Sequence, residues 1–517
     1  MSGVTMAWGL FAVYLVVTYW LAWLGHKRTK SFDDFAVGGR SMGPGMAGLT
    51  LGACLASTAT FVINPGFVYA YGLPALLALT LPLFAGVFAG LALLGPGFRR
   101  HGAKATTLPV WIGDRYGSQG LRAWFALLCL LNVFYVVLIV VGAAYVMSAS
   151  MGVSYPWAVA IVVSVVFSYV FLGGTYAHAY TNTAQGIVML VVAAIIFVAA
   201  LAAIGSPAAA LERLAAQDPH LVSLTHPESP FYRHWVEVLV CPFLIGFTLV
   251  AQPHLLLKTL YLKKASDMAK FAGVGFGCFV VFSLVLFAGL AARLELGAGI
   301  PQDVAAARWL AGAFPPALGA LVSVAIIAAA MSTLDGLLVA VSAIVGADLV
   351  AHPAIAPQLG YHSEEARNQA ALRAGRWTIV VLGVVAWGVS LSPPRLVGIF
   401  GTVGTYGLLV ASLPAILFGV ARGKTPPAWS IWLSSVIGLA VHFALYASGV
   451  TLNTGLTACA GLLVALPIPA VARLLAGAEV EAAAAPIEAV ALARAKGLRV
   501  ESSMSLLSPS GRLVAAE

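Results

Sequence analysis

The sequence has few charged residues for its length. Asp, Glu, Lys and Arg make up only 9% of its 517 residues, whereas a soluble domain contains about 25%. Such an inventory cannot cover a water-exposed surface, which excludes an ordinary soluble protein. The apolar residues, 61% of the chain, are instead gathered in runs of roughly 18 to 27 residues, the length of a helix that crosses about 30 Å of hydrocarbon. The composition therefore predicts an all-α integral membrane protein.

Several chemical patterns are also missing from the sequence. It has no alternating segments of about ten residues, which a membrane β-barrel would need. Its five cysteines lie inside apolar runs, without the spacing of a metal site or a disulfide framework. A nucleophile with its base, a metal-ligand cluster and a phosphate-binding loop are absent as well. We therefore do not expect an enzyme.

The apolar runs predict about thirteen membrane-spanning helices. The first run lacks the basic n-region and the small-residue cleavage site of a signal peptide, so it is counted as a span. All spans belong to one transmembrane domain, residues 1–476, which a short tail, residues 477–517, follows. The expected spans are residues 5–24, 45–71, 74–95, 121–148, 155–172, 183–204, 236–257, 271–294, 315–345, 377–391, 396–420, 429–447 and 455–475.

The basic residues indicate how these spans are oriented. Thirteen spans divide the loops into two sets, and 23 of the 28 Lys and Arg residues fall in one set. By the positive-inside rule, the rich side is cytoplasmic. We therefore expect a multi-pass protein of the cell membrane with its N-terminus outside and its C-terminus in the cytoplasm. The net charge of +9 is then an orientation signal, and no nucleic-acid partner is expected.

Two spans contain residues that interrupt a helix. The second is small and hydroxyl-rich from Gly52 to Thr60, with Pro65 behind, and the seventh contains Pro242 and Pro253. Either one alone is also compatible with a proline kink in a packed bundle. Five spans separate their starts, which is the spacing of an inverted repeat of five helices with a binding site between its halves. The expected halves are residues 45–205 and 236–420.

The ninth span carries a stripe of small and hydroxyl-bearing residues. Ala329, Ser332, Thr333 and Gly336 recur at three- and four-residue spacing, so they share one face of a helix. Such a stripe can serve helix packing, with each hydroxyl bonded to its own helix. It can also serve a dehydrated sodium ion, because two hydroxyls and the carbonyls of an unwound neighbour supply about five oxygens without a buried charge. The residues alone leave both interpretations open.

Six motifs in order resemble the sodium/solute symporter family, which includes proline, pantothenate, monocarboxylate and sodium/glucose transporters. The resemblance extends from about Phe32 to Ala447. It implies a LeuT-type core of five plus five inverted helices, with one helix before the core and commonly two after it. The motifs are FAVGGRSMGPGMAGLTLGACLAS, PGFVYAYGL, TLPVWIGDRYGS, LGGTYAHAYTNTAQG, QPHLLLKTLYLKKASDMAK and AAAMSTLDGLLVAVSAIVGADL.

The resemblance implies that sodium is the coupling ion. Family members form a sodium site from carbonyls at the unwound second span and from a carbonyl and two hydroxyls of the ninth span. They usually also have an acid in the sixth span, where this chain has Asn182. A neutral amide cannot balance a second buried cation, so we expect one sodium ion per turnover. Matched motif to motif, the sodium ligands are Ala53, Ala56, Ala329, Ser332 and Thr333.

The solute is less defined by the resemblance. Proline transporters of the family have an acid at the position of Leu55 and aromatic residues at those of Ile245 and Leu249, so proline is not expected. The PGFVYAYGL and LSPPRLVGIFG stretches look closest to the pantothenate and monocarboxylate branch, which favours a small organic acid. An anionic head group can bind at a half-helix N-terminus without a buried Arg or Lys. The candidate pocket residues are Ser57, Thr58, Thr60, Asn132, Tyr135, Phe247, Thr248, Gln252 and Tyr406.

Two alternative functions stay open from the sequence. A proton-coupled symporter would use an ionisable group at membrane depth, for which Glu237, His254 and Asp335 are candidates, although acids are so sparse that sodium is favoured. A transporter-like sensor is the other alternative, but no kinase-like extension follows Leu475. The expected partners are the solute, sodium and the lipid bilayer, with no obligatory protein partner.

Overall fold

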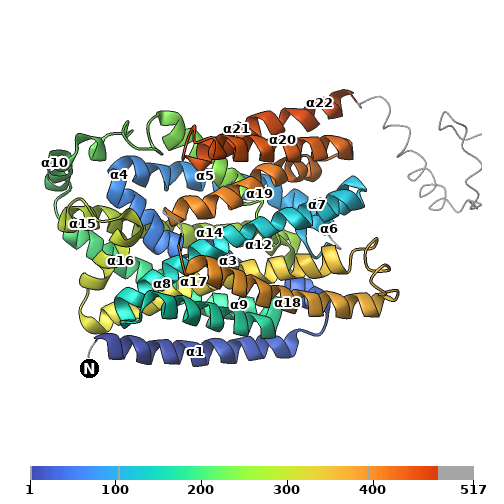
Figure 1. The fold of residues 1–517 in the computed structure, drawn as a ribbon, viewed down its shortest axis with the longest axis horizontal. Helices are drawn as coiled ribbons and strands as arrows, with labels where there is room; N and C mark the ends of the chain where they lie inside the picture. Colours follow the sequence, from blue (N-terminus) through green and yellow to red (C-terminus); the bar gives the residue numbers. More distant parts are fainter. Residues whose placement is uncertain (1–2, 103–104, 394–395, 476–517) are drawn as a thin grey trace, which may run out of the picture.

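The computed structural model describes residues 3–102, 105–393 and 396–475. Over these residues the chain is helical, and its only strand-like contact is a single bridge between Met42 and Leu262. Two parts of the sequence prediction lie outside the described residues. They are the tail expected at residues 477–517 and Arg395, one of the five basic residues in the loop set that has few of them. The helices form one elongated bundle (Figure 1). They are α1 Gly3–Arg28, α2 Phe32–Val37, α3 Pro44–Leu55, α4 Asn64–Ala78, α5 Leu81–His101, α6 Leu108–Tyr116, α7 Gln119–Cys129, α8 Val133–Met151, α9 Tyr155–Ile204, α10 Pro207–Gln217, α11 Cys241–Leu249, α12 Pro253–Leu256, α13 Lys258–Tyr261, α14 Met268–Ser283, α15 Phe287–Leu296, α16 Gln302–Gly312, α17 Pro316–Ile344, α18 Glu364–Ser390, α19 Val397–Val420, α20 Ala428–Ala447, α21 Thr454–Ala465 and α22 Pro467–Leu475.

The described residues contain 11 helices long and apolar enough to cross a membrane, or up to 12 if the bent pair Val236–Leu249 and Pro253–Tyr261 is one span. A shorter apolar helix, Tyr155–Phe171, lies where we expected the fifth span. The expected second span is present in two parts, Pro44–Leu55 and Ala59–Ala78. The all-helical membrane architecture is therefore confirmed, and the count of about thirteen spans agrees approximately.

The boundary between the fifth and sixth spans differs from the expected one. We expected the sixth span to begin near Thr183, but its helix begins at Gly174, where α9 reverses direction. Gly174 has φ 60° and ψ −154°, a backbone conformation that favours glycine. The polar residues just after it, such as His178 and Asn182, are buried, so they face the protein interior. Hydropathy alone therefore places the start of this span too late.

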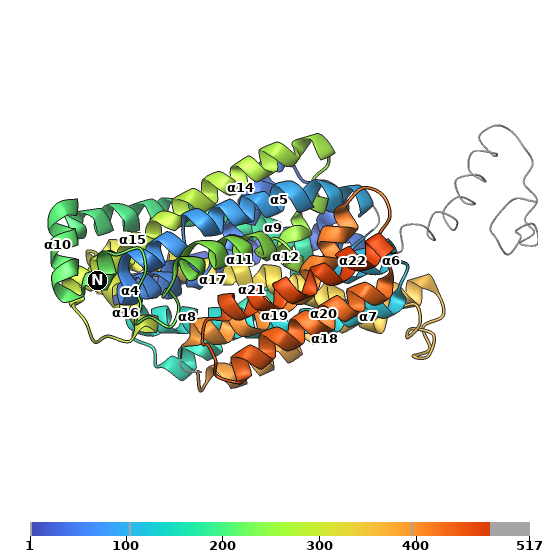
Figure 2. The same ribbon diagram turned by 90° about the horizontal axis from the view of Figure 1, so that it is seen from above.

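Helix α17 forms the centre of the bundle. Every residue from Val322 to Ile344 is buried, and the helix packs against α1, α8, α9 and α18. Because the buried residues of this segment cover all sides of α17, the helix is enclosed by other helices. The hydroxyl stripe of the ninth span is thus held in the core, and Figure 2 shows α17 between other helices in the view from above.

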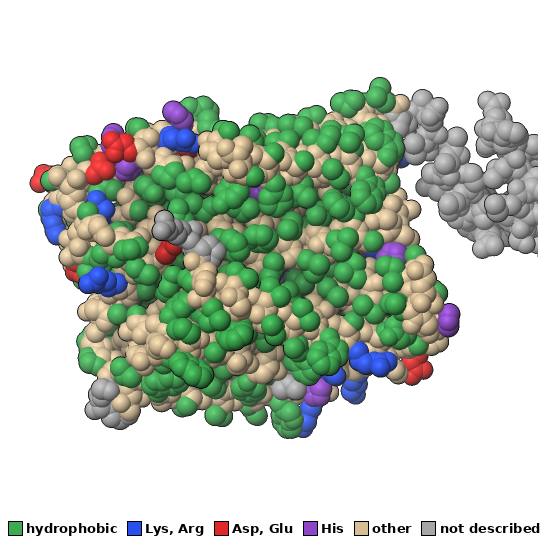
Figure 3. All heavy atoms as spheres, in the orientation of Figure 1, with side chains coloured by type: hydrophobic (Ala, Val, Ile, Leu, Met, Phe, Trp, Pro, Cys, Tyr) green, Lys and Arg blue, Asp and Glu red, His purple; other side chains and the backbone are tan. Residues whose placement is uncertain are grey.

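The surface has the distribution of a protein embedded in a bilayer. On the face shown in Figure 3, charged side chains gather at the two ends and apolar side chains cover the region between them. Large apolar side chains such as Val16 and Trp20 of α1 are exposed. In Figure 1, α10, α15, α16 and the beginning of α1 lie at one end, which we call the α10 end. Helices α6 and α22 reach the opposite end, which we call the α6 end.

Candidate functional site

The second span is unwound in its middle. Helix α3 ends at Leu55, and Ala56 has an extended backbone with φ −94° and ψ 107°. The N–H groups of Ser57 and Ala59 then bond to side-chain oxygens of Thr60 and Ser57, at 3.3 and 3.1 Å. A continued helix would direct these N–H groups to the carbonyls four residues earlier, so the break deprives the carbonyls of residues 53 and 55 of their helical partners, and that of Leu55 accepts from Thr60 Oγ1 at 3.3 Å instead. The small and hydroxyl-rich stretch seen in the sequence is therefore an interruption of the helix.

The seventh span is broken as well. Helix α11 ends at Leu249, Gln252 has a non-helical ψ of 132°, and α12 starts at Pro253. The two parts of this span meet at 62°. A proline has no N–H and cannot follow a helical residue without strain, which explains why the span breaks here. The two predicted interruptions are therefore both present.

The hydroxyl pair of α17 faces the break in the second span. The Oγ of Ser332 lies 2.7 Å from the carbonyl oxygen of Ala329 and 3.1 Å from that of Ala53, so its one proton is shared between these two acceptors. The Oγ1 of Thr333 lies 3.3 Å from the carbonyls of Cys54 and Ala56 and 3.4 Å from that of Ala329. Both hydroxyls are fully buried. The geometry therefore brings together the oxygens of all five residues that the resemblance assigned to sodium.

The chemistry of this set fits a monovalent cation. It consists of neutral carbonyl and hydroxyl oxygens from an unwound stretch and from α17, and hard cations prefer oxygen ligands. In the described residues, no group of three or more His, Cys, Asp or Glu side chains is placed to hold a metal ion. The carbonyl of Cys54 is an additional oxygen that the motif comparison missed, because only the three-dimensional course of the unwound backbone brings it to Thr333.

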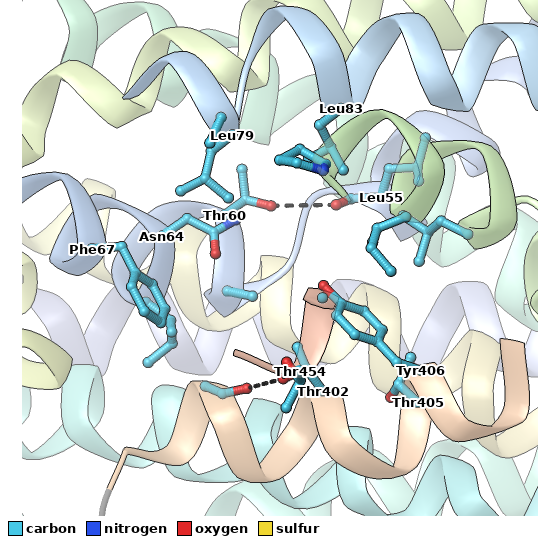
Figure 4. Close-up of a pocket in the computed structure, with 18 of the residues that line it drawn as sticks. Leu55, Thr60, Asn64, Phe67, Leu79, Leu83, Thr402, Thr405, Tyr406 and Thr454 are labelled. Carbon is cyan, nitrogen blue, oxygen red and sulfur yellow. Dashed lines mark hydrogen bonds between the residues drawn. The ribbon is translucent and has the colours of Figure 1, made fainter. Parts of the chain in front are cut away.

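A cavity of about 230 Å³ lies beside the two breaks, and residues of both broken spans line it. In Figure 4, Thr60, Asn64 and Phe67 border it from the second span and Thr402, Thr405 and Tyr406 from α19. Its wall is mostly apolar, and the described lining contains no Lys or Arg. The cavity extends from Leu55 and Gln252 at the breaks to Phe231 and Tyr232 near the α10 end.

The structure places the nine candidate pocket residues in two groups. The first group lines the cavity: Thr60, Tyr135, Gln252 and Tyr406. The second group lies elsewhere: Ser57, Thr58, Asn132, Phe247 and Thr248. In this second group, Thr58 donates to the carbonyl of Ile139, at 3.2 Å, and Thr248 to that of Ile245 in its own helix, at 2.9 Å.

Three polar side chains in the cavity wall are buried without a hydrogen-bond partner in the described residues. These are both amide atoms of Gln252, the Oγ1 of Thr405 and the Nδ1 of His254. Unpaired buried polar groups are costly and mark places where a ligand or water supplies the missing partner. Thr405 and Asn64, with Thr402 and Thr454, were not predicted from the sequence, because helices distant along the chain meet only after folding.

An ion pair lies at the mouth of the cavity. Arg233 Nη2 is 2.6 Å from the Oε1 of Glu237, and the backbone N–H of Arg233 donates to Oε2 at 2.7 Å. These hydrogen bonds raise the pKa of Arg233 above its ordinary value, so its guanidinium stays charged. Glu237 lines the cavity, and its pairing leaves the mouth without an unbalanced charge.

The α6 end is tied together below the breaks. The N–H of Met42 donates to the carbonyl of Tyr261 at 2.9 Å, and that of Lys263 donates to the carbonyl of Met42 at 3.1 Å. Arg122 Nε is 2.6 Å from Asp348 Oδ1. The cavity thus extends toward one end of the bundle while contacts between distant segments join the helices at the other.

One assignment from the sequence needs correction. The expected seventh span ends at residue 257, so Lys258 falls among the 23 Lys and Arg residues of the basic loop set, but its side chain is completely buried. The bend after Leu249 carries α13 into the bundle, so Lys258 packs inside although it follows an apolar run as a loop lysine would. Without Lys258 the split of basic residues is 22 to five, and the orientation argument is unaffected.

The fold and the site define a helical membrane protein of the transporter type, with a cavity beside two broken spans. The solved structure of a sodium-coupled sialic acid symporter in an outward-open state has a TM-score of 0.73 with this chain, at 16% identity, covering 91% of this chain and 97% of that one. At this identity the likeness shows the fold, which confirms the expected LeuT-type core.

The family model described as "Sodium:solute symporter family" matches residues 35–425. The chain therefore belongs to the sodium:solute symporter family. A sodium/pantothenate symporter of Haemophilus influenzae is 27% identical over 455 residues, 85% of this chain and 90% of that protein. An osmoregulated proline transporter of Bacillus subtilis is 23% identical over 454 residues, 86% of this chain and 89% of that protein. The protein is thus a membrane transporter that couples the movement of a small solute to that of sodium, and it is not an enzyme.

Proposed function

We propose that this protein imports a small organic acid, either a monocarboxylate or a pantothenate-like solute, together with one sodium ion. One observation carries the proposal: the backbone stretch that presents carbonyls to Ser332 and Thr333 also lines the cavity through Cys54 and Leu55. An ion bound on one side of this stretch therefore orders the wall of the solute cavity on the other side. Such a shared wall is a direct physical route for coupling the two ligands.

The proposed sodium ligands are the carbonyls of Ala53, Ala56 and Ala329 and the hydroxyls of Ser332 and Thr333. Support comes from their convergence at 2.7 to 3.4 Å in a fully buried region. When sodium binds, it supplies the positive charge toward which these oxygens turn. The hydroxyls, which now donate to the carbonyls, then present their lone pairs to the ion.

The cavity supports a solute with an apolar body and one polar head group. Its volume of about 230 Å³ is just below the ~300 Å³ at which drug-sized ligand pockets begin, so a small solute fits. Gln252 and Thr405 offer unpaired donors to the head group, and apolar side chains such as Phe67 and Leu83 cover the body. The bound sodium balances the charge of a carboxylate, since the described lining has no cationic side chain.

An acid is favoured over proline by the residues around the breaks. Leu55, Ile245 and Leu249 all line the cavity, and the family's proline transporters have an acid or aromatic residues at these positions. A sodium/pantothenate symporter is among the relatives, at 27% identity, although proline transporters are among them as well. Thr60, Tyr135, Gln252 and Tyr406 are the proposed solute contacts among the residues named from the sequence.

We infer import from the proposed orientation. If the α6 end, which carries most of the basic residues, faces the cytoplasm, the cavity extends outward and the solute enters from outside. The N-terminus is then outside and the C-terminus inside. The two halves, residues 45–205 and 236–420, would move against each other to expose the site to the cytoplasm.

Uptake into proteoliposomes tests this function. Labelled lactate, propionate, pantothenate and proline are offered with an inward sodium gradient, with a potassium gradient and with a proton gradient alone. We expect accumulation of at least one of the three acids with sodium only, and no accumulation of proline. Accumulation of proline alone, or acid uptake driven by protons without sodium, would contradict the proposal.

A further inference from the structure

Three buried ionisable side chains lie beside the sodium site and are not part of its oxygen set. Lys258 Nζ is 2.7 Å from His178 Nε2, and His178 Nδ1 is 2.7 Å from Asp335 Oδ1. Their exposed fractions are 0%, 2% and 0%. Because they come from α13, α9 and α17, the folded bundle alone brings them together. We call Lys258, His178 and Asp335 the buried triad.

With Lys258 as an ammonium, His178 neutral and Asp335 as a carboxylate, the buried triad contains one positive and one negative charge. Lys258 donates to His178, and His178 passes a hydrogen bond on to Asp335. If a proton moves from Lys258 to the ring, the cation becomes an imidazolium and the sum of charges is unchanged. Thr181 and Tyr169 donate to the second carboxylate oxygen at 3.1 and 3.4 Å. The charge of Asp335 is therefore balanced from within the protein, as a buried carboxylate requires.

Cys54 connects the buried triad to the sodium ligands. Its carbonyl accepts from Thr333 at 3.3 Å, its thiol donates to the carbonyl of Ser332 at 3.7 Å, and the same sulfur lies 3.8 Å from His178 Nε2. Asn182 donates to this sulfur at 3.2 Å. The Oδ1 of Asn182 is buried without a hydrogen-bond partner in the described residues. Cys54 thus contacts the proposed sodium ligands through its carbonyl and His178, the partner of the Lys258 ammonium, through its sulfur.

We propose that the ammonium group of Lys258 is a built-in counter-cation that supplies the positive charge a second coupling ion would otherwise bring. The proposal rests on the sodium site of the proposed function and explains why that site takes a single ion. A second cation beside Cys54 would need the oxygens of Asp335 and Asn182, but the ammonium of Lys258 already neutralises the carboxylate. The same ammonium repels a further cation in a region of low dielectric.

Removing the charge of Lys258 reverses this arrangement. In Lys258→Met the apolar part of the side chain stays. The space of the ammonium becomes vacant, and the charge of Asp335 loses its counter-charge. An uncompensated carboxylate in the protein interior is costly, and a sodium ion in the space left by the ammonium would lower that cost by neutralising the carboxylate. Lys258→Met should therefore bind a second sodium ion through Asp335 and Asn182.

Direct binding of ²²Na⁺ to the purified full-length protein tests the proposal without knowledge of the solute. The wild-type protein should bind one sodium ion per chain with a Hill coefficient near one. Lys258→Met should bind two, and sodium should raise its melting temperature more steeply than that of the wild type. Lys258→Arg keeps the charge and should bind one. Lys263→Met is the matched control, since Lys263 is exposed five residues later, and it should also bind one.

A charge-neutral double variant separates the role of Lys258 from a fault in folding. Lys258→Met/Asp335→Asn removes both charges and should again bind one sodium ion. Asp335→Asn alone leaves the ammonium unbalanced beside the site and should weaken sodium binding at least tenfold. If Lys258→Met binds one ion as the wild type does, or if Asp335→Asn binds sodium unchanged, the proposal is overturned. A wild-type protein that binds no sodium would instead overturn the sodium site itself.

Discussion

Replacing Thr333 by alanine is the most direct perturbation of the sodium site. Its hydroxyl lies 3.3 Å from the carbonyls of Cys54 and Ala56 and 3.4 Å from that of Ala329. The substitution removes one of about five oxygens around a dehydrated ion in a buried region, where each unmade polar interaction costs ~1–3 kcal/mol. Since 1.4 kcal/mol corresponds to a factor of ten, we expect the sodium concentration for half-maximal uptake to rise about 5- to 150-fold.

The assay is the sodium dependence of solute uptake at saturating solute, with the amount of folded protein measured by size-exclusion chromatography. Ser342→Ala is the matched control: Ser342 is fully buried on the same helix, but its hydroxyl donates to the carbonyl of Val339 in that helix, at 3.0 Å. The control should leave the sodium dependence unchanged. The reasoning is refuted if Thr333→Ala and Ser342→Ala have the same sodium dependence, or if the double alanine variant of Ser332 and Thr333 keeps that of the wild type.

Three further outcomes are expected. Paired fluxes of labelled sodium and solute should give a ratio of one, and transport of a monoanion should not respond to an imposed potential; a ratio of two would contradict the interpretation of Asn182. Because the five native cysteines are buried, a membrane-impermeant thiol reagent should label single cysteines placed at residues 207–233 from outside but not those at Lys263 or Lys424, and the reverse pattern would overturn the orientation. Gln252→Leu removes an unpaired amide from the cavity wall. It should raise the solute concentration for half-maximal uptake about tenfold, which corresponds to roughly 1.4 kcal/mol, and leave the number of bound sodium ions unchanged. An unaltered solute affinity would remove Gln252 from the site.

The parts of the site that follow from local chemistry could be predicted from the sequence. A proline at residue 253 disfavours a continuous helix, and the hydroxyl side chains from Ser57 to Thr60 offer the backbone alternative hydrogen bonds; the structure breaks both spans there. The hydroxyl pair could also be found, because Ser332 and Thr333 lie on the small-residue stripe that the spacing of the ninth span reveals. In each case the signal lies within a few neighbouring residues.

The parts that depend on distant packing could not be predicted. Lys258 follows an apolar run and precedes Lys263 and Lys264, so its sequence context is that of a loop lysine. Its burial results from the 62° bend and from His178, which lies 80 residues earlier in the chain. The span that begins at Gly174 was placed late for the same reason, because its polar residues find partners on α3 and α17 that no local pattern reveals.

The short helical piece from Pro253 to Tyr261 connects the cavity wall to the α6 end through the interior. It is about 13 Å long if its nine residues rise as in a helix, and it follows directly after Gln252 in the cavity wall. Lys258 is attached midway, and the carbonyl of Tyr261 at its far end holds the N–H of Met42. Its two ends are thus held at the cavity wall and at Met42. We therefore expect that separation of the Met42 contact at the α6 end shifts Gln252 in the cavity wall, so that opening toward that side and release of the solute occur together.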